Sequence, residues 1–333
     1  MVASCGPDRD LKTAPSFVRS QASGLQRLGC HVSFGLIDDR TSMNGIRRNI
    51  QRLREQIQEE RPAVVHVQYG SMLAAMARMA KGNKRFVVSF CGDDLLGTPN
   101  PGVAWRLRER ISRWLGLWAA ARADAIIVKS EILSANLPGS LRAKSVVIPN
   151  GVDVDSFQPV ERESARKELG WDAGEFKVLY NLSSGSNSAV KNPVLAHAAV
   201  ERLAQRLPSA KLEVVGSVPF ERMPVLMSAA DALLVTSLHE GSPNVVKEAM
   251  ACDLPVVTVP CGDVRVRLQG VRPGAVCDYD ADQLAEALHA VFQARGRSNG
   301  REVLIGQGLT NLGVAQQILR LYGGNPTTPV SSP

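Results

Sequence analysis

Several common signatures are missing from this sequence. No stretch stays apolar for the ~18 residues that a membrane-spanning helix needs. The N-terminal residues MVASCGPDRD lack the basic-then-apolar pattern of a signal peptide. The six cysteines form no C-x-x-C pair and several lie in apolar runs, so we expect buried, reduced thiols. These absences predict a cytoplasmic protein.

Metal-binding and nucleic-acid signatures are also missing. The five histidines are scattered without ligand spacing, which predicts no structural or catalytic metal. The net charge of +7 and the pI near 9.3 are compatible with nucleic acid, anionic lipid or phosphorylated ligands. Because no zinc-finger, Walker-A or RNA-binding aromatic motif is present, we do not expect a nucleic-acid partner.

The length and the periodicity predict two α/β domains. A chain of 333 residues, 44% hydrophobic and 21% charged, suits two soluble domains of ordinary size. Short apolar runs alternate with amphipathic helical stretches on both sides of a Pro-, Asn- and Gly-rich segment, Ile148–Pro159, which we interpret as a hinge. Such alternation is typical of doubly wound parallel sheets. The strands are expected at Val2–Cys5, His31–Ile37, Ala63–Val67, Phe86–Phe90, Ala125–Val128, Ser145–Ile148, Val178–Leu182, Leu212–Val215, Ala232–Val235 and Pro255–Val259.

The most informative stretch is VTSLHEGSPNVVKEAMACDLPVVTVPC, which runs from Val235 to Cys261. It predicts a strand, a polar loop, a helix and a further strand, the unit of a parallel sheet. Ser242 is a favoured N-cap residue and Pro243 suits the first helical position. The first N–H groups of such a helix, together with its macrodipole, form an anion site that suits phosphate.

Two carboxylates bracket that helix start, Glu240 in the loop and Glu248 within the helix. Because a carboxylate repels phosphate, we expect each to accept hydrogen bonds from hydroxyl groups, as a ribose and a sugar would supply. From the spacing alone, an ordinary capped helix with two solvated glutamates remains an open alternative.

The run EGSPNVVKEAMACDLPVV resembles the E-x7-E signature of the group-1 (family 4) retaining glycosyltransferases, and PNGVD resembles their interdomain segment. The resemblance implies the GT-B fold, in which two Rossmann-like doubly wound parallel-sheet domains face a cleft. Residues 1–150 would bind the acceptor and residues 151–305 the nucleotide-sugar donor. The helix within 306–323 would cross back to the N-terminal domain, and the tail 324–333 is expected to be disordered.

The resemblance also implies residue roles. Glu240 would lie against the transferred sugar, Glu248 would hold the donor ribose, and Lys191 would contact the diphosphate. The residues implied at the distal phosphate are Gly241, Ser242, Pro243, Asn244 and Val245. Gly185 belongs to the Ser- and Gly-rich loop Ser183–Ala189, which precedes Lys191.

The chain departs from the family pattern at three places. No Arg stands between Asn181 and Val190, where the family has one before its Lys. Cys91 replaces the His of a His-Gly-x-Asp motif, and Asp253 replaces a turn Gly. Asp94 of the Cys-Gly-Asp-Asp run has two open readings, an acceptor-binding catalytic residue or a loop-capping aspartate.

Other residues after predicted strands of the first half are candidates for the acceptor side. His66 and Tyr69 would line an acceptor site or simply pack, and Ser130 with Glu131 would cap a helix or contact the acceptor. The stretch Trp105–Arg122 predicts a basic amphipathic helix. It would either pack with solvated arginines or lie peripherally on the inner face of an anionic membrane.

These inferences predict a retaining, metal-independent glycosyltransferase without a cofactor. It would move a sugar from a nucleotide-diphosphate sugar to a hydroxyl of a glycan, a lipid-linked glycan or a small-molecule glycoside. Two alternatives stay open: a sugar-nucleotide epimerase or phosphorylase of the same fold, and an inactive nucleotide-sugar- or glycan-binding scaffold.

Overall fold

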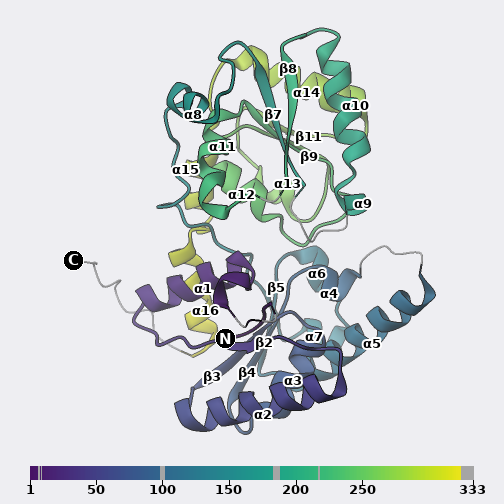
Figure 1. Ribbon diagram of the computed structural model, residues 1–333, viewed down its shortest axis with the longest axis vertical. Coiled ribbons are helices and arrows are strands. Elements are labelled where there is room, and N and C mark those ends of the chain that lie inside the picture. The colour runs from purple at the N-terminus through teal and green to yellow at the C-terminus, as the bar shows by residue number, and fades with distance from the viewer. Residues whose placement is uncertain (7, 9, 98–101, 183–187, 217, 324–333) are drawn as a thin grey trace. The chain divides into compact units, whose positions relative to one another are not determined.

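A computed structural model describes all residues except 7, 9, 98–101, 183–187, 217 and 324–333. The chain divides into two compact units (Figure 1). Unit 1 combines Met1–Gly151 with the segment from Asn311 onward, and unit 2 is Val152–Thr310. The first crossing between the units therefore lies inside the Pro-, Asn- and Gly-rich segment.

Unit 1 is built on a six-stranded sheet in the order β2-β1-β3-β4-β5-β6, and every strand pair is parallel. Its strands are β1 (Val2–Ser4), β2 (Gly35–Ile37), β3 (Val64–Gln68), β4 (Arg85–Phe90), β5 (Ala125–Val128) and β6 (Ser145–Val147). Its α-helices are α1 (Ser16–Arg27), α2 (Met43–Glu60), α3 (Met72–Ala80), α4 (Asp93–Leu96), α5 (Val103–Ala120), α6 (Glu131–Ala135), α7 (Gly139–Arg142) and α16 (Asn311–Leu321).

Unit 2 holds a five-stranded parallel sheet in the order β11-β10-β9-β7-β8. Its strands are β7 (Phe176–Asn181), β8 (Ala210–Val215), β9 (Ala232–Val235), β10 (Val256–Thr258) and β11 (Gly274–Val276). Its α-helices are α8 (Arg162–Leu169), α9 (Ser188–Lys191), α10 (Pro193–Ala204), α11 (Met223–Ala229), α12 (Asn244–Ala251), α13 (Val264–Arg267), α14 (Ala281–Ala294) and α15 (Gly300–Gly306).

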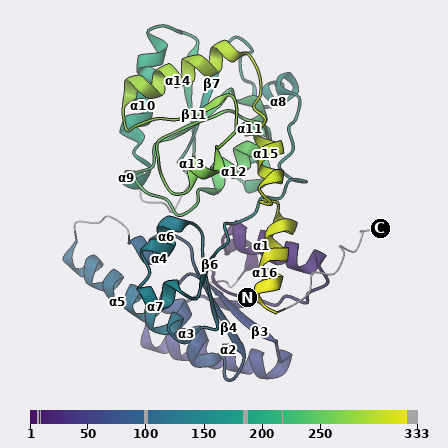
Figure 2. The same cartoon turned by 180° about the vertical axis from the view of Figure 1, so that it is seen from behind.

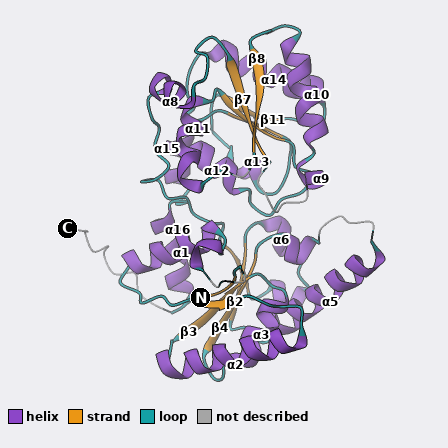
Figure 3. Ribbon diagram, viewed as in Figure 1, coloured by secondary structure: helices purple, strands orange, loops and turns teal. Residues whose placement is uncertain are grey.

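The central strands are apolar on both faces, as parallel strands covered by helices on each side must be. All residues of β5 and of β9 are buried, and each strand coincides with its predicted bounds. Figure 3 shows the strands of each unit enclosed by helices. The predicted fold class, two Rossmann-like parallel α/β domains, is confirmed.

The last helix belongs to unit 1, where α16 packs against α1 (Figure 2). The contact is close because α1 carries Gly24, where an added Cβ would lie 2.7 Å from the carbonyl oxygen of Asn311. The ring nitrogen Nδ1 of His66 in β3 also lies 2.5 Å from the hydroxyl of Tyr322, just after α16. The two ends of the described chain are thus tied into one core.

Some elements differ from the sequence expectation. The strand predicted over His31–Ile37 covers only Gly35–Ile37, because its neighbour β1 offers three residues for pairing. The strand β11 and the helices α8 and α15 were not predicted. β11 is three residues long, and α8 is polar apart from Ala165 and Leu169, so neither shows a clear apolar period.

Candidate functional site

The helix α12 begins one residue later than expected. Pro243 occupies the N-cap position, and no side chain of the described residues caps the helix. The prediction that Ser242 is the N-cap is therefore wrong. Ser242 instead turns its hydroxyl to Asp263, with Oγ 3.0 Å from Oδ2. The N-cap residue therefore supplies no side-chain oxygen to the first N–H groups of the helix, the groups that form an anion site at a helix start.

A buried charged network holds the loop before α12. The Lys247 side chain is fully buried and its Nζ donates to Ser242 Oγ at 3.0 Å. Asp263, at the start of α13, also lies 3.1 Å from Arg267 Nε. Burial raises the pKa of Asp263, and the positive charges of Lys247 and Arg267 oppose that rise. Charges buried this deeply are stable only when they are paired, so the network fixes the loop.

Lys191 and Glu240 meet at the carboxyl edge of the unit 2 sheet. The Nζ of Lys191 lies 2.7 Å from Oε1 of Glu240, and both side chains are about four-fifths buried, with exposed fractions of 16% and 20%. Lys191 ends α9, which comes after β7, and Glu240 lies in the loop after the neighbouring strand β9. Parallel α/β sheets place ligands at this edge.

The main chain around Lys191 is anchored to both strands. Its carbonyl oxygen accepts hydrogen bonds from the Tyr180 hydroxyl and from Thr236 Oγ1, each at 2.8 Å. The Leu238 N–H donates to the carbonyl of Val190 at 2.8 Å. These bonds hold the lysine in place independently of its salt bridge.

Glu248 lies one helical turn inside α12. Burial raises the pKa of its carboxyl group to about 7, against an opposing effect of the adjacent Lys247 charge. A carboxylate removed from water in this way gains most from a ligand hydroxyl that donates to it.

The glycine-to-aspartate departure at residue 253 leaves the turn intact. Asp253 adopts a left-handed conformation, with φ of 53°. Its Oδ1 accepts from the Arg301 N–H at 2.8 Å, and its carbonyl oxygen accepts from the Ser298 N–H at 2.8 Å. Aspartate tolerates this region better than most residues, and the two contacts offset the remaining strain.

A second glycine shapes the site from the next strand. Gly262, after β10, has a φ of 56°, and an added Cβ would lie 2.9 Å from the carbonyl oxygen of Gly241. The loop after β10 therefore presses against the backbone of the Glu240 loop. Gly262, Asp263 and Lys247 were missed in the sequence. The first two follow the carboxyl end of a strand beside β9, a signal that could have found them.

Most of the remaining predicted donor residues lie around the start of α12. Gly241, Pro243 and Val245 are buried around the start of α12, and Asn244 is its half-buried first residue. Gly185 lies outside the described residues. Lys191, Glu240 and Ser242 thus lie in the segments after the carboxyl ends of β7 and β9, and Glu248 lies in the helix α12 that follows.

In unit 1, Asp94 binds backbone amides. Its carboxylate accepts from the N–H groups of Gly70, Cys91 and Gly92 at 2.6, 2.9 and 2.8 Å. This is the loop-capping geometry. Burial raises the pKa of Asp94, while these hydrogen bonds oppose the rise. Burial likewise raises the pKa of the Cys91 thiol to about 12, so the thiol stays protonated at neutral pH.

Lys129, directly after β5, was not singled out in the sequence. Its side chain is 1% exposed, and its Nζ has no hydrogen-bond partner among the described residues. Burial lowers its pKa, and the Cys91 and Asp94 groups oppose that change. Lys129, Cys91 and Asp94 therefore form one electrostatically coupled group at the carboxyl edge of the unit 1 sheet.

Of the other unit 1 candidates, His66, Tyr69 and Ser130 make structural contacts, whereas Glu131 is exposed at the start of α6. His66 is buried between the Tyr322 hydroxyl and Ser89 Oγ, the latter at 2.7 Å from Nε2. Tyr69 contacts the edge of Phe17, with ring centroids 5.9 Å apart. Ser130 caps α6 by accepting from the Leu133 N–H at 3.4 Å.

The described residues hold neither a cluster of metal ligands nor a membrane-spanning helix. No group of three or more His, Cys, Asp or Glu side chains is placed to hold a metal ion. In the same part of the chain, no helix is both long and apolar enough to cross a membrane.

Comparison with known proteins defines the class. Residues 21–156 match Glycosyltransferase Family 4, and residues 187–294 match Glycosyl transferases group 1. Together these stretches cover most of the chain. The chain belongs to this family of glycosyltransferases.

Solved structures with the GT-B fold are similar over nearly the whole chain. Sucrose-phosphate synthase from Thermosynechococcus elongatus is 19% identical, with a TM-score of 0.72, covering 97% of this chain and 94% of that one. HepE from Anabaena, solved with UDP and glucose, is 17% identical, with a TM-score of 0.70, covering 97% and 99%. At these identities the likeness shows the fold.

Curated relatives match a smaller part. The D-inositol 3-phosphate glycosyltransferase of Segniliparus rotundus is 26% identical over 54% of this chain and 47% of its own length. That of Pseudarthrobacter chlorophenolicus is 28% identical over 44% and 41%. The chain spans about half the length of the curated relatives it matches.

Proposed function

We propose that this protein transfers a sugar from a nucleotide-diphosphate sugar to an acceptor hydroxyl, with retention of the anomeric configuration. The ion pair between Lys191 and Glu240 carries the proposal, because it places one cation and one carboxylate at the carboxyl edge of the sheet, in and beside the loop that leads into α12. The family membership and the HepE structure with UDP and glucose support a nucleotide-sugar donor.

In this proposal each group has a separate task. The N–H groups at the start of α12 and the Lys191 ammonium bind the donor diphosphate. As the bond to the sugar breaks, negative charge grows on that diphosphate, and these fixed donors stabilise it. Glu240 accepts hydrogen bonds from the sugar, and Glu248 accepts them from the ribose.

We also propose that transfer needs no metal, because Lys191 and the helix N–H groups supply the positive charge that a divalent ion would otherwise provide. Turnover should be unchanged by EDTA. A loss of turnover that Mg²⁺ or Mn²⁺ restores would contradict this part of the proposal.

The donor site is tested by calorimetric titration with nucleotide diphosphates and nucleotide-sugars, followed by assays of turnover. Glu248→Ala should weaken donor binding, because the ribose loses its acceptor. Glu240→Gln should mainly lower kcat, because it keeps the side-chain volume and removes the charge beside the sugar. Wild-type kinetics in both variants would refute these roles. Selective nucleotide binding without turnover would favour an inactive binding scaffold.

The helix α5 supports a peripheral membrane contact and hence a lipid-linked acceptor. Its inner face is buried at Gly116, Ala119 and Ala120. The opposite face exposes an apolar stripe spaced at helical intervals, in which Val103, Leu107, Ile111 and Trp114 are 79%, 59%, 49% and 62% exposed.

The charges around the stripe favour an anionic lipid surface as its partner. The helix carries four arginines, at 106, 108, 110 and 113, against one acidic residue, Glu109. An apolar stripe flanked by arginines suits the interface of an anionic bilayer.

Co-sedimentation with phosphatidylglycerol vesicles at low salt tests this contact. Leu107→Ser with Trp114→Ser should abolish it. Val194→Ser is the control, because Val194 in unit 2 is an apolar residue that is even more exposed, at 79%. Equal binding by all three proteins, or none by the wild type, would refute the contact.

A further inference from the structure

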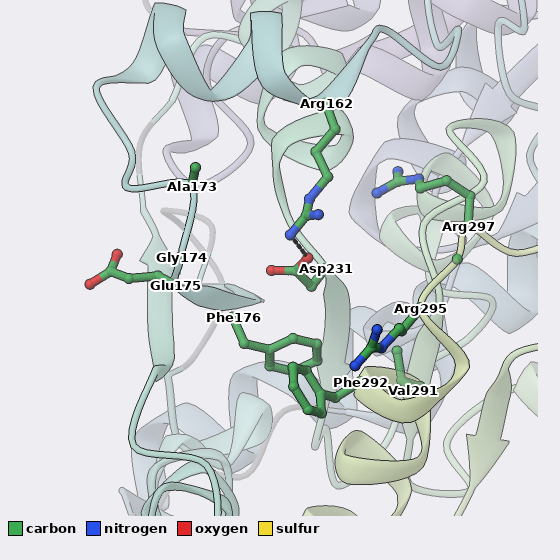
Figure 4. A pocket seen from close by; sticks show the side chains of 11 residues that line it. Arg162, Ala173, Gly174, Glu175, Phe176, Asp231, Val291, Phe292, Arg295 and Arg297 are labelled. Carbon is green, nitrogen blue, oxygen red and sulfur yellow. Dashed lines mark hydrogen bonds and ion pairs between the residues drawn. The ribbon is translucent and has the colours of Figure 1, made fainter.

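A cavity of about 480 Å³ lies at the amino-terminal edge of the unit 2 sheet (Figure 4). Phe176 begins β7, Asp231 precedes β9, and Phe292 and Arg295 come from the end of α14. The proposed donor residues come after the opposite, carboxyl ends of the same strands: Lys191 follows β7, and Glu240 and Glu248 follow β9. The cavity is therefore a separate place in unit 2. Its volume is in the range of small-molecule sites.

Two guanidinium groups line this cavity and can bind an anion: among the described residues, one is unpaired and the other forms only a surface ion pair. The guanidinium of Arg295 has no hydrogen bond or ion pair to any described residue, and Figure 4 shows it directed toward Phe292. Arg162 is paired with Asp231, but its side chain is 44% exposed, and a surface pair of this kind contributes little.

The acidic groups of the cavity are already balanced by other partners. Asp231 keeps the buried Arg166 at 2.6 Å and the Lys177 N–H at 2.6 Å, even if Arg162 turns away. Glu175 lies 2.8 Å from the Lys177 ammonium. The cavity therefore has an excess of positive charge.

Arg297 adds positive charge to the cavity, but its guanidinium already donates to backbone carbonyl groups. Its guanidinium donates to the carbonyl oxygens of Met227, Ala230 and Cys252 at 2.7 to 3.0 Å, and in Figure 4 it points away from the two phenylalanine rings. It contributes a fixed positive field, whereas Arg162 and Arg295 supply the hydrogen bonds.

The wall between the arginines is aromatic. Phe176 and Phe292 pack edge to face, with ring centroids 5.6 Å apart, and Val291 adds to the apolar surface. An apolar wall beside planar cations suits a ligand that has a flat ring at one end and a phosphate at the other.

We propose that this cavity is a second ligand site, which binds a phosphate monoester carrying an aromatic ring between Arg162, Arg295 and the pair of phenylalanines. The site does not depend on the proposed glycosyl transfer, since none of its residues belongs to the donor site.

Calorimetric titration with phenyl phosphate tests the site, because this probe has no ribose hydroxyl with which to engage Glu248. The wild type and Glu248→Ala should bind it equally, and more tightly than inorganic phosphate. Arg295→Gln and Arg162→Gln should each weaken binding about tenfold, the size expected for one charge-assisted hydrogen bond. The Arg295 side chain is exposed and its guanidinium has no partner among the described residues, so this variant should retain the fold.

Arg265→Gln, at an exposed arginine of α13, is the matched control and should bind as the wild type does. The proposal is overturned by an absence of saturable binding to the wild type. It is also overturned if both pocket variants bind normally, or if Arg265→Gln loses as much affinity as they do.

Discussion

The carboxyl group of Glu248 should make unit 2 less stable as the pH rises, and Glu248→Gln should remove that effect. In the folded chain its pKa is about 7, against 4.5 in the unfolded chain. Between these two values the folded chain holds a proton that the unfolded chain has lost. Stability therefore falls as the pH increases through this window. A glutamine has nearly the same shape and undergoes no such titration.

The size of the effect follows from the difference between the two pKa values. A difference of about 2.5 at about 1.4 kcal/mol for each pKa unit gives roughly 3 kcal/mol. Glu248 is only partly buried, so solvent screening lowers the expected figure to about 2 kcal/mol. The variant and the wild type should be similarly stable at pH 4.5, and the variant should be more stable by about this amount at pH 8.

Urea unfolding at the two pH values measures this difference. Trp171 is the only tryptophan of unit 2, so replacing Trp105, Trp114 and Trp118 by Phe in all proteins lets fluorescence report on that unit. Glu302→Gln, at an exposed residue of α15, is the matched control. A gain in Glu248→Gln that is the same at both pH values, or larger at low pH, would refute the reasoning.

Two further substitutions test the buried charged network of unit 2 and the packing of α5 in unit 1. Lys247→Met should lower the free energy of unfolding of unit 2 by about 2 kcal/mol, because it leaves Ser242 and Asp263 buried with one partner fewer. Lys211→Met at an exposed site is its control in urea titrations, and equal stability of the two would contradict the role of the network. Gly116→Ala should lower the melting temperature of unit 1 although alanine favours helices, because its Cβ would lie 1.7 Å from the Gly70 carbonyl oxygen. Gly139→Ala, where no atom lies within 4 Å of the added Cβ, should not, and equal melting of the two variants would show that α5 can shift without cost.

The sequence predicted those features that depend on local pattern. The strands Ala125–Val128 and Ala232–Val235 were found to the residue, because apolar runs bounded by polar residues are read directly from the chain. The prediction of a capping serine failed because a tertiary partner competed for it. Ser242 bonds to Asp263, which lies 21 residues further on, and no local rule reports such a partner.

The burial of charged groups was also invisible in the sequence. Lys247 sits among helical residues and would ordinarily extend into solvent, whereas the structure buries it completely. Lys129 follows an apolar strand and is buried as well. A buried lysine can be predicted only when the groups that offset its charge are known, and here those groups follow other strands.

The position of α16 affects the order in which the two units can fold during synthesis. Unit 1 is made of two pieces of sequence with the whole of unit 2 inserted between them. The bond between His66 and Tyr322 joins residues 256 positions apart. During synthesis, the first piece must wait for its last helix until the inserted unit has left the ribosome, and unit 2 can fold in the meantime. A nascent chain that stops short of Asn311 should therefore hold a folded unit 2 beside an unfinished unit 1, whose α1 has no partner helix.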